Sequence, residues 1–518
     1  MKKDKIIKWT ITILLIILPF LDMLRTTNVR HFEILGISII ELGNILLIGI
    51  AFILTLFKCR KKELFGVFGY LILVCIYIIL HYKHIITFDT DIFPRANFNF
   101  ITETFYICRV YILPLALLFV LIKNRDIFNK EFYFKIIKIV IGIIAGSIIV
   151  LNILKLSYIS YSDKHNFNLY NIFDYFLYQG DFRLLSSRGW FDSANELSAI
   201  MFMLFPINIY MLYNEGKKSN LALFIMQFVA MILLGTRTSA FGAVLISVVA
   251  LFVYLITCVL KFDNINTKFL KYFSFCSLVC IAFCMISPFM IARLSEGKAD
   301  FSIKDQSAYS DLGNSSNDTK SFSKMIEKYK SEYLINEIYL KIYPVKNDKD
   351  FWLKIASRDK SLNSNDRKMK TDIIERIKER NDNDMDTYLG MGYTLNMIDL
   401  ERDYYYQYYI FGILGVLILM GPYFGVLIYL IIKGFTNFKK NFNFKTVLCL
   451  MGPLLGLLIA YYSGHVFGWV SPMMWLVVTL ALIVYVVLEN CNIPQKKFEK
   501  SVEKNKKEFN KVLEYIKK

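Results

Sequence analysis

Residues 470–488 read VSPMMWLVVTLALIVYVVL, an apolar run without a single charged side chain. A helix of about 20 apolar residues is long enough to cross the hydrocarbon core of a bilayer, and this run has that length. The chain has 518 residues, of which 55% are hydrophobic and 16% aromatic. The pattern repeats about twelve times, at approximately 6–24, 36–57, 64–81, 105–122, 133–156, 194–213, 220–236, 238–260, 270–292, 404–432, 446–463 and 470–488. The sequence therefore predicts an all-α polytopic membrane protein.

The basic residues between the spans predict the orientation of the chain. Cytoplasmic loops of membrane proteins are enriched in Lys and Arg. The loops that would be cytoplasmic in a twelve-span topology are rich in Lys: Lys2, Lys3, Lys5, Lys8, Lys58, Lys61, Lys62, Lys123, Lys130, Lys217, Lys218, Lys261, Lys268, Lys433, Lys439 and Lys440. We therefore expect both termini to be cytoplasmic in the cell membrane. The net charge of +18 is then explained by lysines near anionic lipid, and we expect no nucleic-acid partner.

The spacing of the spans divides the chain into four parts. Residues 1–292 hold nine predicted spans, and residues 404–488 hold three more. Between them, residues 293–403 form a polar insert, which we expect to be a large extracellular loop subdomain. Helical periodicity at 322–345 and 368–381 predicts short helices within it. Residues 489–518 form a Lys-rich cytoplasmic tail.

Arginine, rather than lysine, is the prevalent basic residue in the short outer loops. The arginines on that side are Arg25, Arg30, Arg95, Arg183, Arg188 and Arg237. Arginine presents a rigid fork of donors that matches phosphate or carboxylate in a bidentate way, which lysine does not. This preference indicates an anionic ligand, of which a diphosphate fits best, handled at the outer membrane surface.

The stretch SRGWFDSANELSA at 187–199 opens the sixth span from outside. Asp192 or Ser193 is placed to cap the helix, and Asn195 and Glu196 fall in its first turn. Polar residues at that depth are costly in lipid unless they face a polar cavity. A helix start offers free N–H groups to an anion, and Arg188 lies beside it. This stretch is a predicted anion site.

Three further outer stretches carry candidate residues. Arg237 lies in the tight reversal Leu234–Gly242 between the seventh and eighth spans. Glu401, Arg402 and Asp403 lie where the large insert re-enters the membrane, and acids at such a rim are candidates for proton transfer. His465 lies in the minimal turn between the last two spans. A solvated charged rim and a structural histidine remain the alternatives for the last two stretches.

These motifs, taken in order, resemble a known family. The Arg188–Ser198 stretch, the Gly235–Ser239 turn, the insert and the Gly412-Ile413-Leu414-Gly415 that follows it are similar to O-antigen ligase-like and Wzy-type polysaccharide polymerase membrane proteins, especially those of Gram-positive exopolysaccharide clusters. So are the opening Leu18–Asp22 and the closing Gly464-His465-Val466 with Ser471-Pro472.

The resemblance implies an integral-membrane glycosyltransferase with a GT-C-like fold. Family members transfer glycan from undecaprenyl diphosphate to a second glycan or lipid at the outer face, without metal or nucleotide cofactors. Arg188 and Arg237 match the family arginines thought to hold the diphosphate. Arg183 precedes Arg188 in the same loop. Asp22, Asn195, Glu196 and Arg402 are the expected supporting residues. The classical ligases have a histidine shortly before the glycine at the Gly412 position, and this chain does not.

The missing histidine leaves the proton acceptor open among Glu401, Asp403 and His465. We expect a metal-independent polymerase that joins capsular or exopolysaccharide repeat units at the extracellular face. The alternatives are a ligase acting on a lipid or cell-wall acceptor, and a flippase or transporter of the same lipid-linked glycan. The expected partners are the bilayer, the lipid-linked donor, the glycan acceptor and other polysaccharide-assembly membrane proteins. Ionisable residues concentrated at the outer rim favour chemistry there over passage across the membrane.

Overall fold

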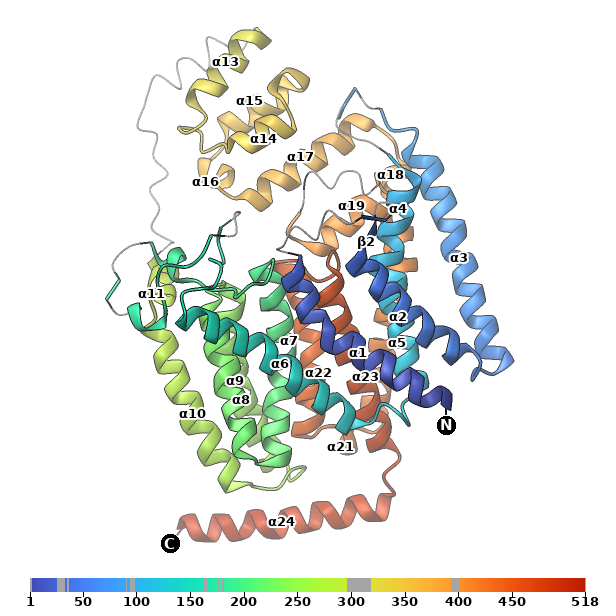
Figure 1. The fold of residues 1–518 in the computed structure, drawn as a ribbon, viewed down its shortest axis with the longest axis vertical. Coiled ribbons are helices and arrows are strands. Elements are labelled where there is room, and N and C mark those ends of the chain that lie inside the picture. The colour runs from blue at the N-terminus through green and yellow to red at the C-terminus, as the bar shows by residue number, and fades with distance from the viewer. Residues whose placement is uncertain are drawn as a thin grey trace. The chain divides into compact units, whose positions relative to one another are not determined.

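A computed structural model of the chain describes residues 2–25, 33–34, 37–89, 91–93, 98–162, 166–175, 177–178, 181–295, 318–392, 398 and 400–517 (Figure 1). Two of the predicted outer arginines, Arg30 and Arg95, lie outside these residues. Helices dominate the described residues, which confirms the predicted all-α polytopic class.

Within the described residues, ten helices are long and apolar enough to cross a membrane: Lys2–Leu24, Lys61–Ile85, Phe100–Lys123, Lys130–Ile153, Ala194–Glu215, Arg237–Val259, Thr267–Met285, Asp403–Thr436, Phe444–Tyr462 and Val470–Cys491. Two shorter apolar helices, Glu41–Leu56 and Lys218–Leu233, coincide with the other two predicted spans. The spans therefore lie where the apolar runs predict them.

The chain forms two compact units. Unit 1 consists of Met1–Leu64, Arg109–Glu296 and Pro422–Lys518, and unit 2 consists of Phe65–Cys108 and Gly297–Gly421. The predicted extracellular insert thus packs in one unit with the third span, with the start of the fourth and with the first part of the tenth. Each unit is described separately below.

Unit 1 contains most of the membrane-spanning helices. Its elements are α1 (Lys2–Leu24), β1 (Glu33–Ile34), β2 (Ile37–Ser38), α2 (Ile39–Leu56), η2 (Cys108–Ile112), α5 (Leu113–Lys123), α6 (Lys130–Ile153), η3 (Ile172–Asp174), η4 (Phe182–Leu185), α7 (Ala194–Glu215), α8 (Lys218–Leu233), α9 (Arg237–Val259), α10 (Thr267–Met285), α11 (Pro288–Ser295), α20 (Gly421–Thr436), α21 (Phe438–Asn441), α22 (Phe444–Tyr462), α23 (Val470–Cys491) and α24 (Gln495–Lys517). The two strands form an antiparallel pair in which Glu33 faces Ser38.

Helices α7 and α23 form the core of unit 1. Both helices are apolar on every face, and 94% of the most apolar stretch of each helix is buried. Helix α7 packs against α8, α9, α22 and α23 (Figure 1). The mid-helix amide Asn208 donates to Gln227 Oε1 of α8 at 2.8 Å. The start of α7, where the anion site is predicted, therefore belongs to one of the two most buried helices of the unit.

Unit 2 combines membrane-length helices with the short helices of the polar insert. Its elements are α3 (Lys61–Ile85), α4 (Phe100–Ile107), α13 (Thr319–Tyr329), α14 (Glu337–Ile342), η6 (Val345–Asn347), α15 (Lys349–Ser357), α16 (Lys360–Asn363), α17 (Asp366–Asn381), α18 (Met385–Leu389), α19 (Asp403–Gly415) and η8 (Val416–Met420). Short helices are present at both predicted stretches: α13 and α14 at 322–345, with Leu334 between them at φ +54°, and α17 at 368–381.

The insert helices of unit 2 surround an aromatic core of their own. Trp352 is fully buried and donates from Nε1 to the Tyr343 carbonyl at 2.9 Å. Asp348 caps α15 by accepting from the Phe351 amide at 3.0 Å, and its other oxygen accepts from Tyr343 and from Arg376. The insert is therefore a folded subdomain over the residues described, rather than a flexible loop.

Candidate functional site

The start of α7 is fixed by hydrogen bonds on both sides of Arg188. Ser193 has extended backbone angles and accepts from the Glu196 amide at 3.4 Å, so it is the helix cap. The Arg188 amide donates to the Tyr158 carbonyl at 3.0 Å. The Tyr158 amide in turn donates to the carbonyl of Gly189, which has φ +64°, at 2.8 Å. The Arg188 side chain is buried, with 6% of its surface exposed. Of the two residues predicted to cap this helix, Asp192 and Ser193, the structure shows Ser193 in that role.

The turn that carries Arg237 lies against this stretch. The Ser187 amide donates to the Leu233 carbonyl at 2.8 Å, and Ser198 Oγ lies 2.6 Å from Thr236 Oγ1. Thr236 caps α9, so Arg237 is the first residue of that helix, and its side chain is exposed. The structure thus brings together the two segments that carry the arginines, each at a helix N-terminus.

Gly235 makes this approach possible. Its φ is +66°, and a Cβ there would lie 2.8 Å from the Phe289 ring and 3.0 Å from Ser186 Cβ. Only glycine takes this backbone conformation without steric cost. The Tyr161 hydroxyl donates to the Gly235 carbonyl at 2.9 Å, which ties the 157–193 segment to the same turn.

The turn that carries His465 approaches the Arg237 turn. Ser463 Oγ lies 3.5 Å from Thr238 Oγ1, one residue beyond Arg237. His465 itself has φ +68°, a left-handed conformation that costs a non-glycine residue about 1–3 kcal/mol. Its ring stacks on Trp469, and its Nδ1 lies 3.0 Å from the Ser463 carbonyl oxygen. His465 therefore lies on the arginines' side of unit 1, as the sequence predicts.

A buried cluster of charge joins the end of α1 to the start of α7. Arg25 Nη1 lies 3.4 Å from Glu196 Oε2 and 3.7 Å from Asp22 Oδ1. Ser471 of α23 donates to Asp22 Oδ2 at 2.7 Å. A cavity of about 10 Å³, enough for about one water molecule, is lined by Asp22, Arg25, Phe191, Asp192, Ser193, Glu196 and Leu197. The cluster holds three carboxylates and one guanidinium, and Glu196 Oε1 has no hydrogen-bond partner in the described residues.

Two predicted residues of this side contribute less to the described contacts. Arg183 lies in η4 with its guanidinium 5.9 Å from the Phe182 ring, and its side chain is exposed. Asn195 is exposed in the first turn of α7. Arg25, by contrast, is the residue that links the predicted supporting acids Asp22 and Glu196, and the sequence places it only among the outer arginines.

The predicted acids of the re-entry stretch belong to unit 2. Glu401 Oε2 lies 2.8 Å from Arg367 Nε, and Glu401 Oε1 lies 3.6 Å from Lys370 Nζ, both on α17. Asp403 begins α19 and is 3% exposed. The Arg402 guanidinium lies 5.8 Å from the Tyr405 ring. Glu401 therefore pairs with two basic residues of α17.

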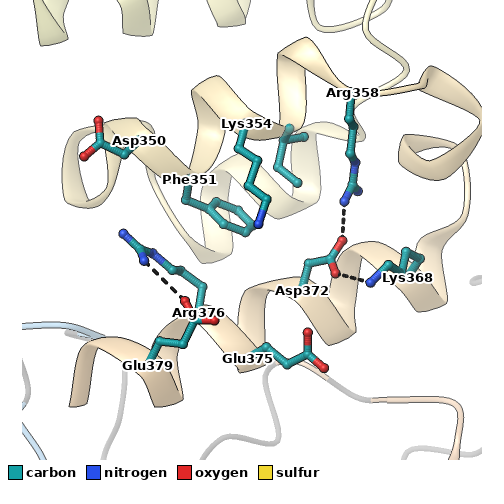
Figure 2. A pocket seen from close by; sticks show the side chains of 10 residues that line it. Asp350, Phe351, Lys354, Arg358, Lys368, Asp372, Glu375, Arg376 and Glu379 are labelled. Carbon is teal, nitrogen blue, oxygen red and sulfur yellow. Dashed lines mark hydrogen bonds and ion pairs between the residues drawn. The ribbon is translucent and has the colours of Figure 1, made fainter. Parts of the chain in front are cut away.

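A second pocket lies within the insert helices of unit 2, between α15 and α17 (Figure 2). Its volume is about 350 Å³, and its lining includes four basic and four acidic side chains. Asp372 pairs with Arg358 and with Lys368, and Arg376 pairs with Glu379 (Figure 2). Because these charges neutralise one another, the pocket offers no concentrated positive charge to a diphosphate.

The sequence interpretation missed one pair of buried ionisable residues in unit 2. His81 of α3 and Glu103 of α4 are 0% and 1% exposed, and His81 Nε2 lies 3.5 Å from Glu103 Oε2. The predicted span 64–81 ends at His81, and the predicted span 105–122 begins two residues after Glu103. The sequence interpretation therefore singled out neither residue. In the described part of the chain, no three His, Cys, Asp or Glu side chains lie close enough to share a metal ion.

Comparison with known proteins gives one match. No curated protein and no solved structure matches the chain. The family model described as O-antigen ligase like membrane protein matches residues 4–490, a range that runs from α1 to α23 and includes every candidate residue above. With ten membrane-length helices and the arginine-bearing turns in the expected order, the chain belongs to the O-antigen ligase-like family of membrane proteins.

Proposed function

We propose that this protein transfers a glycan from an undecaprenyl-diphosphate-linked oligosaccharide to a glycan acceptor at the extracellular face of the cell membrane, and so polymerises capsular or exopolysaccharide repeat units. The observation that carries the proposal is the joining of the Arg188 and Arg237 segments by the Ser187–Leu233 and Ser198–Thr236 hydrogen bonds. The family adds support for glycan transfer in the membrane.

The two arginines have complementary surroundings for a diphosphate. Arg188 is buried, so its position is fixed before a ligand arrives, whereas Arg237 is exposed and accessible to a headgroup. The helices α7 and α9 both begin here, and helix N-termini direct partial positive charge and N–H groups toward an anion. Fixed positive charge of this kind suits a leaving group whose negative charge grows during the reaction.

The reaction balances without a metal ion. The acceptor hydroxyl oxygen forms a bond to the anomeric carbon of the donor sugar, and the bond from that carbon to the diphosphate oxygen breaks. The electron pair leaves with the diphosphate, which Arg188 and Arg237 stabilise more in the transition state than in the ground state. The hydroxyl proton passes to a base, for which Glu401, Asp403 and His465 are the candidates from sequence.

The test is turnover in liposomes that contain the host's lipid-linked oligosaccharide. The wild-type protein is expected to lengthen the lipid-linked chains, and Arg237→Ala to lose about 10²–10³-fold in rate. Arg237→Lys is also expected to be poor, because a point charge does not replace the guanidinium fork. Arg60→Ala, in a loop predicted to be cytoplasmic, is the matched control and should retain activity.

The other outcomes separate the alternatives. Transfer of the glycan to a lipid or cell-wall acceptor, without chain growth, would identify a ligase. Glycan that crosses the bilayer unchanged in length would identify a flippase and would refute glycosyl transfer. Full activity of Arg237→Ala would refute the proposed diphosphate site.

A further inference from the structure

Two pockets of unit 2 adjoin along helix α17. The α15–α17 pocket described above has a volume of about 350 Å³, and the α17–α19 pocket, lined also by α18, has a volume of about 340 Å³. Glu375 and Glu379 line both pockets, and because they are four residues apart they lie on one face of the helix. Ligand sites occupy about 300–1,000 Å³, so each pocket has room for sugar rings.

The lining of the two pockets follows one side of α17 along its length. The residues of this stripe, from the helix and the position after it, recur at spacings of three and four: Lys368, Asp372, Glu375, Glu379 and Asp382. At 1.5 Å per residue the stripe is about 21 Å long. Its far end meets Tyr408 and Tyr409, in the second turn of the membrane-length helix that begins at Asp403. The stripe therefore has the dimensions of a site for a chain molecule rather than for a single small ligand.

The α15–α17 pocket holds hydrogen-bond donors that the described residues do not use. Arg358 pairs with Asp372 through Nη1, but its Nη2 is buried and has no hydrogen-bond partner in the described part of the chain. Lys354 extends from α15 toward α17 (Figure 2), and among the described residues it forms no ion pair. A buried donor without an acceptor is costly, so a ligand that brings acceptor oxygens is favoured here.

The α17–α19 pocket adds aromatic rings and acceptor oxygens. Tyr409 donates to Glu375 Oε1 at 3.1 Å. Lys378 donates from Nζ to the Tyr408 hydroxyl and to the Thr387 hydroxyl, each at 2.9 Å, so the Tyr408 ring is held in place. A tyrosine ring combines an apolar face with a polar edge. Sugar rings have the same combination, because their C–H faces are apolar and their rims carry hydroxyls.

The charges of the two pockets disfavour an acidic ligand. The α15–α17 pocket is balanced, with four basic and four acidic side chains. The α17–α19 pocket has one basic residue, Lys378, against four acids: Glu375, Glu379, Asp382 and Asp384. This excess of negative charge repels a carboxylate or a phosphate. Sugar hydroxyls, by contrast, donate to carboxylates and accept from lysine and arginine, so they match both pockets.

From these features we infer that the α17 stripe and its two pockets bind the glycan chain, and that this glycan is neutral or amine-bearing rather than acidic. The inference rests on the proposed function, in which the glycan is the substrate. Sugar hydroxyls accept from Lys354 and from Arg358 Nη2, and they donate to Glu379. A sugar ring packs on Tyr408. The site holds the chain, and no bond of the glycan is made or broken there.

Binding of glycan to the full-length protein in detergent tests the inference. The probe is a set of oligosaccharides of several repeat units, released from the host's polysaccharide and titrated by calorimetry. Lys354→Ala combined with Glu379→Ala removes a donor from one pocket and the acceptor shared by both, and should raise the Kd at least about tenfold. An unchanged Kd would overturn the inference.

The insert helices provide a matched control. Glu327 and Glu379 are 58% and 67% exposed, and each pairs with a cation three residues away. Lys341 is an exposed lysine of α14, and neither Lys341 nor Glu327 lines either pocket. Glu327→Ala combined with Lys341→Ala should therefore bind the oligosaccharides as the wild-type protein does. Equal weakening in the two double variants would overturn the inference.

The sign of the ligand's charge gives a test that needs no variant, and it decides if the pocket variant does not fold. The wild-type protein should bind chitosan oligomers, which carry amines, more tightly than oligogalacturonate of the same length, which carries carboxylates. The reverse order would overturn the inference. Tighter binding of oligolysine than of any glycan would also overturn it, and would identify a site for basic peptides.

The binding measurement does not depend on turnover, so the two proposals fail separately. Wild-type protein that lengthens chains in liposomes, but binds the oligosaccharides no better than the pocket variant, refutes only this inference. Wild-type protein that binds them through these pockets, yet transfers nothing with an authentic donor and acceptor present, refutes the proposed function and supports the glycan site.

Discussion

Ser198 Oγ and Thr236 Oγ1 lie 2.6 Å apart, and this contact joins the first turn of α7 to the cap of α9. Ser198 Oγ also donates to the Ala194 carbonyl at 2.7 Å, so Thr236 is the donor between the two hydroxyls. Thr236 accepts from the Ser239 amide at 3.2 Å. One threonine therefore holds both arginine-bearing segments in register.

Thr236→Val should disturb this register. The substitution keeps the side-chain shape, but it removes the donor to the buried Ser198 hydroxyl and leaves the Ser239 amide without its Thr236 partner, at a cost of about 1–3 kcal/mol. We expect a lower melting temperature in detergent and a lower rate of glycan transfer. Thr236→Ser retains the hydroxyl and is the control. Equal melting temperatures for the two variants would show that the bond does not stabilise the site.

Arg25→Ala should destabilise unit 1 strongly. The side chains of Arg25, Asp22 and Glu196 are 17%, 12% and 5% exposed, so the two acids depend on this guanidinium for neutralisation. Removing one member of a buried ion pair typically costs about 3–5 kcal/mol. Thermal unfolding should show the loss, and Arg25→Met combined with Glu196→Gln should recover part of it. Arg25→Ala that unfolds at the wild-type temperature would contradict this account.

Gly412→Ala should prevent correct folding of unit 2. The backbone at Gly412 is left-handed, and the added methyl would lie 2.4 Å from the Tyr388 carbonyl carbon. Gly421→Ala is the control, because its φ of −50° is helical and nothing lies within 4 Å of its Cβ. We expect Gly412→Ala to accumulate poorly in membranes and Gly421→Ala to accumulate normally. Comparable amounts of folded protein from both would refute the close packing at Gly412.

Glu401→Gln should have little effect on transfer. Glu401 is 30% exposed and pairs with Arg367 and Lys370, and partly exposed pairs contribute about 0.2–1 kcal/mol. Turnover should stay within a few-fold of wild type. A folded Glu401→Gln protein that loses about 10²-fold would instead support Glu401 as the base expected from sequence.

The aromatic core of the insert helices, around Trp352 and Asp348, should lose stability in acid. Burial alone would raise the pKa of Asp348, but the hydrogen bonds from Arg376, the Phe351 amide and Tyr343 outweigh it and lower that pKa from 3.8. A lowered pKa means that the charged form stabilises the fold above the unfolded value and that this stabilisation is lost as the pH falls through the folded value. Amide hydrogen exchange over 318–389 should therefore quicken below about pH 3.8. In Asp348→Asn this acid dependence should be absent.

Local signals predicted the parts of the site that depend on neighbours in sequence. The cap at Ser193 follows from a serine three residues before a glutamate, and the Arg237 turn follows from two apolar spans with almost nothing between them. Both signals act within a few residues, where capping and turn chemistry operate. The membrane spans are predicted for the same reason, since each apolar run is read by itself.

Pairs that are distant in sequence left no local signal. Arg25 and Glu196 are 171 positions apart, and nothing near either residue indicates the other. His81 follows Ile78, Ile79 and Leu80, so it reads as the end of a span rather than as part of a buried pair. The core of the insert helices is built from aromatic residues on several short helices. The hydrophobic periodicity of any one helix does not reveal it.

The contact between His81 and the Leu389 carbonyl spans 308 positions of the chain. At about 5–20 residues per second, a ribosome makes Leu389 roughly 15–60 s after His81. During that interval α3 is already a membrane-length helix with a polar imidazole near its end. Only 22% of its most apolar stretch is buried even in the finished unit. Until Leu389 is made, the imidazole of His81 therefore lacks its carbonyl partner, so this part of unit 2 is completed late in synthesis.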